Sequence, residues 1–290
     1  MKISWFDSAT NVDDAVANAE RARAAGCYRY WSPQISNADP MVVLGIVGRE
    51  VADIGLGTSV VAMQTTFAQN LAAQARTIAQ ASGGRFTLGL GASHQPAMEM
   101  AFGIPWTKPY TYMVEYLDAL LPLLEDQQVS TTGEFVTHHT SLNVPGPTPD
   151  VMLAALGPKM LTLASERTAG TITWMTGPKT IESHIRPGIG NGHIAAGVPI
   201  FITDDVPAAR EFAGRTLAIY GQLPSYRAML DREGMDGPAD MVLAGDLETV
   251  RSGLEAYKAA GVDEIAMNVL GTGESLEATW ELAASLGGVM

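Results

Sequence analysis

The sequence predicts an α/β fold, a single (β/α)8 TIM barrel with inserted loops at the carboxyl-terminal face of its strands. The chain has 290 residues, a length that suits one such barrel, and short apolar runs alternate along it with longer amphipathic ones. That alternation is typical of repeated strand and helix units around a parallel sheet. No internal repeat, low-complexity tract or linker divides the chain. We therefore expect residues 1–290 to form one barrel domain.

The short apolar runs are the predicted strands, and there are enough of them to close one barrel. They are Lys2–Trp5, Tyr28–Trp31, Ile54–Val61, Phe86–Leu90, Val151–Ala155, Thr171–Met175, Pro199–Thr203 and Glu264–Val269. Buried parallel strands are apolar on both faces, and these runs have that character.

The amphipathic stretches are the predicted helices. They are Val12–Ala25, Met41–Glu50, Phe67–Ala81, Tyr112–Glu125, Pro158–Arg167, Pro207–Tyr220, Leu247–Ala260 and Leu276–Leu286. Asp246 and Ser275 directly precede two of them, and such side chains cap the free N–H groups at a helix start. Gly26 and Gly261 each stand where a helix must end before a strand.

Three segments depart from this alternation: Ala92–Tyr110, Gln127–Pro149 and Pro178–Val198. The first and third follow predicted strand ends, so we expect them on the face where barrels carry their sites. Within the second segment, Val129–Val136 predicts a small hairpin on the opposite face.

The composition excludes several classes of protein. Lys and Arg number 18 against 31 Asp and Glu, a formal charge of −13, which argues against a nucleic-acid partner. The single cysteine, Cys27, excludes an intramolecular disulfide and favours a reducing, cytoplasmic environment. No apolar run approaches the roughly 20 residues of a membrane span, so we expect no membrane partner.

The residue types at the predicted strand ends favour a bound organic cofactor. The five histidines show no metal-ligand spacing, so no metal site is predicted, and no nucleophile elbow or phosphate-binding loop is present. The strand ends instead carry aromatic, small and hydroxyl residues, which suit a large planar cofactor. Gly157 and Gly177 each precede a proline that can open a helix, so their backbone N–H groups can face an anion.

Two runs, Leu56–Val61 and Gln74–Gly91, resemble the third- and fourth-strand signatures of the luciferase-like monooxygenase superfamily. Further along, Glu115–Leu117, Ala154–Leu161 and Thr173–Pro178 resemble its coenzyme F420-dependent branch more than its flavin branch. The resemblance implies a (β/α)8 barrel that binds this deazaflavin and transfers a hydride between it and a small organic substrate. It also implies pairing into a homodimer.

The resemblance assigns roles to particular residues. Ser59 and Val60 fall where the family forms a bulge with a non-prolyl cis peptide bond behind the deazaflavin ring. Gly91, Ala92 and Ser93 are expected along the ring edge or side chain of the cofactor. The phosphate is expected at two turns, formed by Leu156, Gly157, Pro158 and Lys159 and by Thr176, Gly177 and Pro178.

The sequence also departs from the family pattern. Many deazaflavin enzymes of the family end the second strand with Asp-His, where this chain has Gln34 and Ile35. His94 stands where one branch has a glutamate proton donor, and histidine can act as a general acid or base near neutral pH. A purely structural hydrogen bond is the other interpretation of His94. Without the Asp-His pair, reduction of an activated double bond or carbonyl is favoured over alcohol oxidation.

Four residues are predicted to wall the substrate pocket: Trp5, Trp31, Gln34 and Trp106. Trp174 is a further candidate if its ring faces the pocket rather than the core.

Two other functions remain open at this point. One keeps the fold but uses FMN, as a monooxygenase; the other is a barrel that binds a cofactor without turnover. In each case an anionic cofactor would meet a chain of charge −13. We therefore expect backbone amides at Gly157 and Gly177, rather than a basic patch, to recognise its phosphate.

Overall fold

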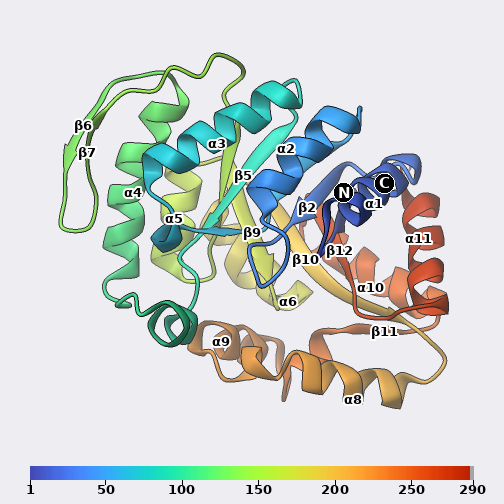
Figure 1. The fold of residues 1–290 in the computed structure, drawn as a ribbon. Coiled ribbons are helices and arrows are strands. Elements are labelled where there is room, and N and C mark those ends of the chain that lie inside the picture. Colours follow the sequence, from blue (N-terminus) through green and yellow to red (C-terminus); the bar gives the residue numbers. More distant parts are fainter. Residues whose placement is uncertain (288–290) are drawn as a thin grey trace. The chain divides into compact units, whose positions relative to one another are not determined.

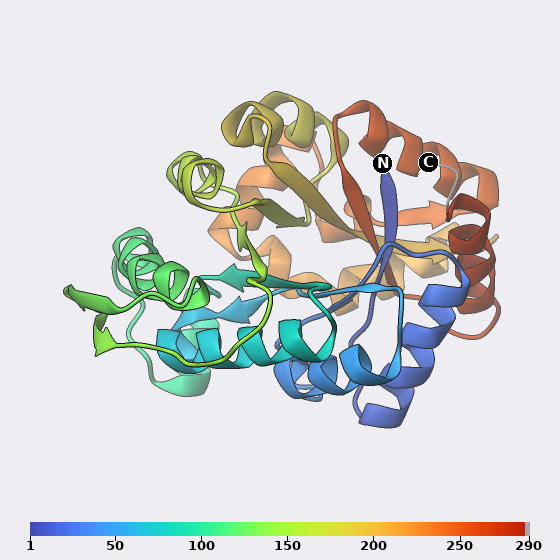
Figure 2. The same cartoon turned by 90° about the horizontal axis from the view of Figure 1, so that it is seen from above.

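The structure is a computed structural model that describes residues 1–287, and the chain forms two compact units. The first unit contains Met1–Asp7, Asn18–Trp31 and the chain from Ala155 onward. The second contains Ser8–Ala17 and Ser32–Ala154. Figure 1 labels many of the helices and strands of both units, and Figure 2 shows the same ribbon from above.

The first unit is built on a parallel sheet whose strands follow the order β9, β10, β12, β1, β2. Their bounds are Lys2–Phe6 (β1), Arg29–Ser32 (β2), Gly170–Trp174 (β9), His193–Ile202 (β10) and Glu264–Val269 (β12). A short strand, β11 (Leu243–Gly245), pairs with the end of β10. Most residues of these strands are buried, and many of the buried ones are apolar, as is typical of parallel strands covered on both faces.

Helices surround the strands of the first unit. They are α1 (Val12–Ala24, whose residues from Asn18 belong here), α5 (Pro158–Arg167), α6 (Pro178–Thr180), α7 (Arg186–Ile189), α8 (Val206–Thr216), α9 (Pro224–Glu233), α10 (Leu247–Ala259) and α11 (Glu274–Leu286). Short 3-10 or π turns are η3 (Ile181–Ile185), η4 (Ala218–Gly221) and η5 (Pro238–Met241). Asp246 caps α10 by accepting a hydrogen bond from Thr249 N, as its position in the sequence predicts.

A buried carboxylate, Glu264, joins four strands of the first unit. Its side chain is fully buried, and Ser4 Oγ and Trp31 Nε1 donate to Oε1 at 2.6 and 2.7 Å. Arg29 Nη1 lies 2.8 Å from Oε2, and His193 Nε2 lies 3.0 Å from the same oxygen. Burial alone would raise the pKa of Glu264, but the contacts with His193, Arg29 and Ser4 outweigh it and lower the pKa.

The second unit has a parallel sheet in the order β3 (Gly55–Thr58), β5 (Phe86–Gly91), β8 (Asp150–Ala154), and β4 (Val61–Ala62) pairs with the end of β5. Its helices are α2 (Pro40–Glu50), α3 (Ala68–Ala81) and α4 (Pro109–Leu124), with short turns η1 (Met63–Thr65) and η2 (Ala97–Ala101). The α2 and α3 helices lie side by side in both views (Figures 1 and 2). A hairpin of β6 (Val129–Thr132) and β7 (Thr137–Thr140) lies beside α4.

One buried arginine holds the helical layer of the second unit together. Arg76, on α3, is 1% exposed and donates to the carbonyl oxygens of Leu124 at 2.7 Å and Val144 at 2.7 Å. It also pairs with Asp126. Because the guanidinium is fully satisfied, α3, the end of α4 and the segment leading to β8 are fixed to one another.

All eight predicted strands are present, with differences at their ends. The third is interrupted at Ser59 and Val60, so it forms β3 and β4. The prediction for Pro178–Val198 was wrong, because this stretch is not an inserted loop. It contains α6, η3 and α7, and β10 already begins at His193. Prolines 178 and 187 stand at helix starts, and Gly190 ends the helical segment with a φ of +60°, so loop-like residue types mark helix boundaries here.

Several smaller elements were missing from the sequence prediction: α9, β11 and the short 3-10 and π turns. The predicted hairpin at Val129–Val136 is present and extends to Thr140. Among the described helices, none combines the length and the hydropathy needed to cross a bilayer.

Replacing Glu264 by Gln is expected to destabilise the protein by about 3 kcal/mol at pH 7, because Arg29 is left buried without its counter-charge. Chemical unfolding of wild type and E264Q measures this loss. E248Q, which removes the same charge from an exposed position on α10, is the matched control.

The same variant tests the pH dependence of stability. Because folding lowers the pKa of Glu264, the ionised carboxylate stabilises the fold above the ordinary glutamate pKa. That contribution is lost as the pH falls through the folded-state value. The stability difference between wild type and E264Q should therefore shrink in acid; a difference that stays constant down to pH 3 would contradict it.

Candidate cofactor site

In the second unit, the break between β3 and β4 forms a bulge with a cis peptide bond between Ser59 and Val60. The resemblance predicted a cis bond at these residues, and this prediction is confirmed. Ser59 N donates to Ser32 O at 2.9 Å, and Gln34 N donates to Val60 O at 3.4 Å. Ser32, at the end of β2, and Gln34, just after it, therefore hold the bulge through its backbone.

Val60 and Gly91 pack together at this point. A Cβ added to Gly91 would lie 2.6 Å from Val60 Cγ2, closer than carbon atoms approach one another. Only glycine at position 91 leaves room for the Val60 side chain at the end of β5. The bulge and the end of β5 are thus in direct contact, and the small residues Ala92 and Ser93 come next along the chain.

Two glutamine side chains fix the same strand ends. Gln34 Oε1 accepts a hydrogen bond from Ala62 N at 2.9 Å, so this residue supports the bulge. Gln64 Nε2 donates to Ala92 O at 2.7 Å. Gln64 Oε1 is buried and accepts no hydrogen bond from the part of the chain that the structure describes. A buried acceptor in that state is unfavourable, which marks it as a place where a bound molecule could donate.

His94 comes directly after Ser93 in the chain. Its ring is partly buried, and burial lowers the pKa of His94 below the ordinary histidine value. Burial therefore favours the neutral imidazole. Trp106, in the same segment, is half-buried, and its backbone N donates to Glu99 Oε1 at 3.2 Å.

A groove of about 240 Å³ lies in the second unit between η1, α4 and the β6–β7 hairpin. Its polar and aromatic lining includes Gln64, Tyr112, Tyr116, Phe135 and His138. The rings of Tyr112 and Phe135 stack with centroids 5.1 Å apart. Sequence reasoning missed this groove because its walls come from segments far apart in the chain. Gln64 lines this groove and also donates a hydrogen bond to the carbonyl oxygen of Ala92, just after β5. The groove therefore lies next to the end of β5.

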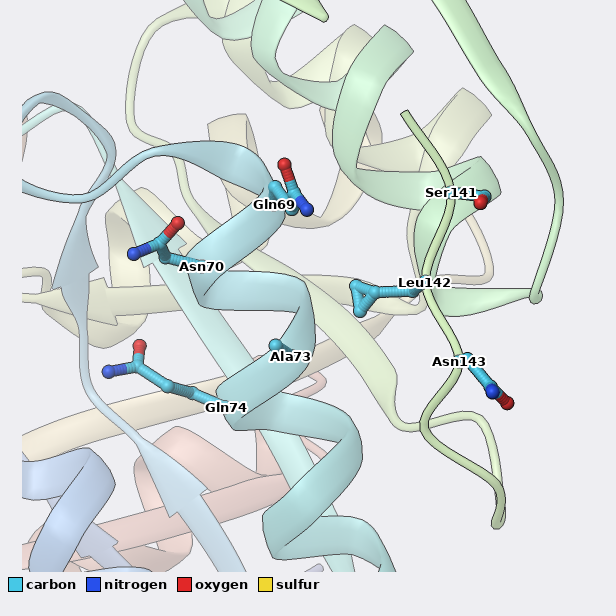
Figure 3. Close-up of a pocket in the computed structure, with 7 residues that line it drawn as sticks. All are labelled: Gln69, Asn70, Ala73, Gln74, Ser141, Leu142 and Asn143. Atoms are coloured by element: carbon cyan, nitrogen blue, oxygen red, sulfur yellow. The ribbon is translucent and has the colours of Figure 1, made fainter. Parts of the chain in front are cut away.

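A larger cavity of about 480 Å³ lies between the outer side of α3 and residues 141–143 (Figure 3). In Figure 3 the Leu142 side chain projects toward α3, which presents amide side chains. Its lining residues are Gln69, Asn70, Ala73, Gln74, Ser141, Leu142 and Asn143. None of these can act as an acid or base near pH 7, and none is a predicted site residue, so this cavity is not our candidate site.

In the first unit, Gly157 is the N-cap of α5, and an added Cβ there would meet no atom within 4 Å. Gly157, Pro158 and Lys159 are exposed. Before them, Leu156 O accepts a hydrogen bond from His184 Nε2 at 2.8 Å. The start of α5 is therefore uncovered, as an anion site requires.

The second predicted phosphate turn is different. Thr176 and Gly177 are buried, and Glu233 Oε1 accepts a hydrogen bond from Thr180 N at 2.6 Å. An added Cβ on Gly177 would lie 2.7 Å from Glu233 Oε2. The structure thus places a carboxylate where the sequence analysis expects a phosphate. The expectation that Gly177, with Thr176 and Pro178, would be open to an anion was wrong, because the sequence does not reveal that the end of α9 packs on this turn.

The predicted aromatic walls also need correction. Trp5 is 3% exposed and stacks on Trp280 of α11, with ring centroids 3.3 Å apart. Trp31 is fully buried, with its Nε1 bound to Glu264. Both rings belong to the core of the first unit and not to a surface that a substrate could reach, because their positions along the strands direct them there.

Other aromatic rings gather at the strand ends of the first unit instead. The half-buried Trp174, at the end of β9, stacks on Phe6 with centroids 6.4 Å apart and meets Tyr220 edge-on at 5.9 Å. Phe6 stands next to Trp5 in the sequence. The two rings lie in different surroundings because successive side chains of a β-strand point to opposite faces of the sheet. Within residues 1–287, no three His, Cys, Asp or Glu side chains are grouped closely enough to hold a metal ion.

Comparison with known proteins gives the fold and the family. A tetrahydromethanopterin reductase from Methanopyrus kandleri, described as coenzyme F420 dependent, superposes with a TM-score of 0.82 over 98% of both chains at 20% identity. The oxygenating constituent of 3,6-diketocamphane monooxygenase from Pseudomonas putida, solved with FMN, gives a TM-score of 0.76 at 14% identity, covering 99% of this chain and 97% of that one. The fold is thus the predicted (β/α)8 barrel.

A Mycobacterium tuberculosis protein, provisionally described as a coenzyme F420-dependent oxidoreductase, is 28% identical to the chain, and the match covers 91% of each. The family model described as luciferase-like monooxygenase matches residues 1–276. The chain therefore belongs to the luciferase-like monooxygenase family and is one of its oxidoreductase enzymes.

Proposed function

We propose that the chain is a coenzyme F420-dependent oxidoreductase that transfers a hydride between the deazaflavin and a small organic substrate. The observation that carries the proposal is the contact between the cis bulge and the end of β5, where Val60 packs against Gly91. Ala92 and Ser93 follow in the chain, and small residues of this kind leave room for a planar ring. The F420-dependent proteins from Methanopyrus and Mycobacterium named above support this choice of cofactor.

The residues present fit a deazaflavin in two respects. Gln64 Oε1 is a buried acceptor without a donor among residues 1–287, and a deazaflavin ring carries an N–H group. The exposed start of α5 at Gly157 offers backbone N–H groups and a helix dipole to the phosphate, and Lys159 lies beside it in the chain. We therefore assign the ring to Ser59, Val60 and Gly91–Ser93, and the phosphate to Leu156–Lys159.

The cofactor, when bound, supplies or accepts the hydride as a two-electron carrier, so the protein needs to provide position, exclusion of water and one proton. His94 follows the proposed ring-binding residues directly and can exchange that proton. Gln34 cannot titrate, and its amide holds the bulge. Because the chain has Gln34 and Ile35 where many deazaflavin enzymes of the family have an Asp-His pair, we favour reduction of an activated double bond or carbonyl over alcohol oxidation.

The groove beside Gln64 is our proposed substrate site. Its volume of about 240 Å³ suits a small molecule, and the stacked rings of Tyr112 and Phe135 offer apolar surface. Trp106 remains a proposed wall residue, since it is half-buried in the segment after His94.

An FMN-dependent monooxygenase is the second candidate. The likeness to the Pseudomonas putida oxygenating protein, solved with FMN, favours it. Either cofactor, F420 or FMN, would use the same ring-binding residues, but the two carry different phosphate esters. Direct measurements of F420 and FMN binding therefore separate the two candidate functions.

Fluorescence titration is expected to show that the purified protein binds F420 with a micromolar or lower Kd and binds FMN at least tenfold more weakly. G91A should weaken F420 binding at least tenfold, because the added methyl group displaces Val60. G237A is the matched control, since a Cβ there meets no atom within 4 Å. Absence of F420 binding by the wild type would contradict the proposed cofactor.

His94→Ala is expected to lower turnover of reduced F420 with a panel of enones about 100-fold or more. A proton donor must be protonated, and burial lowers the pKa of His94, so wild-type kcat/KM should decline as the pH rises through a value below 6.5. H94A should lose this decline, whereas H139A, on the exposed hairpin, should keep it. Full activity of H94A at every pH would refute the role of His94 and leave the cofactor assignment intact.

The resemblance further predicts a homodimer. Light scattering on the purified protein should then give twice the chain mass of 30.7 kDa. A mass equal to one chain would contradict this prediction.

A further inference from the structure

Glu233 is the last residue of α9, and its side chain lies at the start of the helical segment 178–189. It is 6% exposed. Its Oε1 accepts the hydrogen bond from Thr180 N at 2.6 Å, and its carboxyl group occupies the space that a side chain at Gly177 would need. A negative charge is favourable here, because the N-terminal end of a helix carries a positive partial charge.

The surroundings leave that charge in place. Lys179 Nζ lies 3.2 Å from the backbone oxygen of Glu233 rather than from its carboxylate. Glu233 therefore places its own carboxylate at this turn.

The two turns that the sequence predicted for phosphate recognition are consequently unequal. They belong to the same unit, and the hydrogen bond from His184 to Leu156 O ties the segment after Gly177 to the residue before Gly157. One helix start, at Gly157, is open. The other already holds a carboxylate, which uses a backbone donor and repels a second anion.

This inequality matters because the two candidate cofactors carry different phosphates. FMN ends in a phosphomonoester, with three terminal oxygens and a charge between about −1.5 and −2 at pH 7. The phosphate of F420 is a diester, with two terminal oxygens and a single charge. A monoester needs more donors than a diester and suffers more from a neighbouring carboxylate.

We propose that Glu233 is a specificity-determining residue, whose carboxylate at Gly177 admits the phosphodiester of a deazaflavin and disfavours the phosphomonoester of FMN. The inference rests on the proposed function, since it takes the start of α5 at Gly157 as the phosphate site and the turn at Gly177 as its neighbour in the first unit. The inference names Glu233 as the residue that distinguishes the two cofactors, and charge repulsion as the physical reason.

The test compares wild type and E233Q in fluorescence titrations with F420, FMN and riboflavin. Gln keeps an oxygen that can accept from Thr180 N but removes the charge. We expect the Kd for FMN to fall at least tenfold in E233Q, while the Kd for F420 changes by less than threefold. Riboflavin has no phosphate, so its affinity should not change. E248Q, which makes the same charge change on an exposed helix start, should leave all three affinities as in the wild type.

A thermal melt establishes that E233Q is folded, and E233M, similar in length and uncharged, replaces it if it is not. An unchanged ratio of FMN to F420 affinity in the folded variant, with the wild type binding F420, would overturn the role of Glu233 alone. An equal gain for riboflavin and FMN would also overturn it, because the effect would not act through the phosphate. Failure of the wild type to bind F420 would overturn the proposed function and this inference with it.

Discussion

The carboxylate of Glu264 is the constraint on which the first unit depends. A buried charge is tolerated only when every lone pair is satisfied, and here hydroxyl, indole, guanidinium and imidazole groups from three other strands converge on it. Shifting any of these strands by one residue would turn its contributing side chain to the opposite face. The network therefore fixes the strand register, and with it the positions at which the strands end.

The second unit uses backbone packing for the same purpose. Gly91 allows Val60 to approach the end of β5, and the backbone contacts from Ser32 and Gln34 hold the bulge from the other side. Arg76 then fastens the helices that cover this sheet. Buried charged groups thus hold the strands of the first unit and the helices of the second in place. The strand ends can then carry the small and aromatic residues that suit the proposed planar cofactor.

The net negative charge of the chain affects individual sites in the structure differently. In the proposed function, a protein of net charge −13 recognises an anion through directed dipoles, and the open helix start at Gly157 offers such a dipole. At Gly177 the Glu233 carboxylate already lies at the start of a helical segment. Two turns that look alike in the sequence therefore differ in charge, and we propose that this difference affects which phosphate ester the chain accepts.

The sequence by itself determined the eight strands, most of the helices, the family and the cis bulge, because these depend on local patterns: apolar runs, capping residues and the continuous run ending in Gly91. It did not reveal the helical nature of 178–189, where prolines and glycines mark helix ends rather than a loop. Nor did it separate Trp5, which faces α11, from its neighbour Phe6, which stacks on Trp174.

Only the tertiary structure decided what meets at each strand end. Glu233 contacts Gly177, and Phe135 lines the groove beside Gln64. In both cases the two residues come from segments that are distant in the chain. No periodicity records such contacts, because they arise when helices pack and bring side chains together across the fold. The physical reason is that a residue type specifies what chemistry it can perform, whereas its neighbours in space determine its charge environment and whether a ligand can reach it.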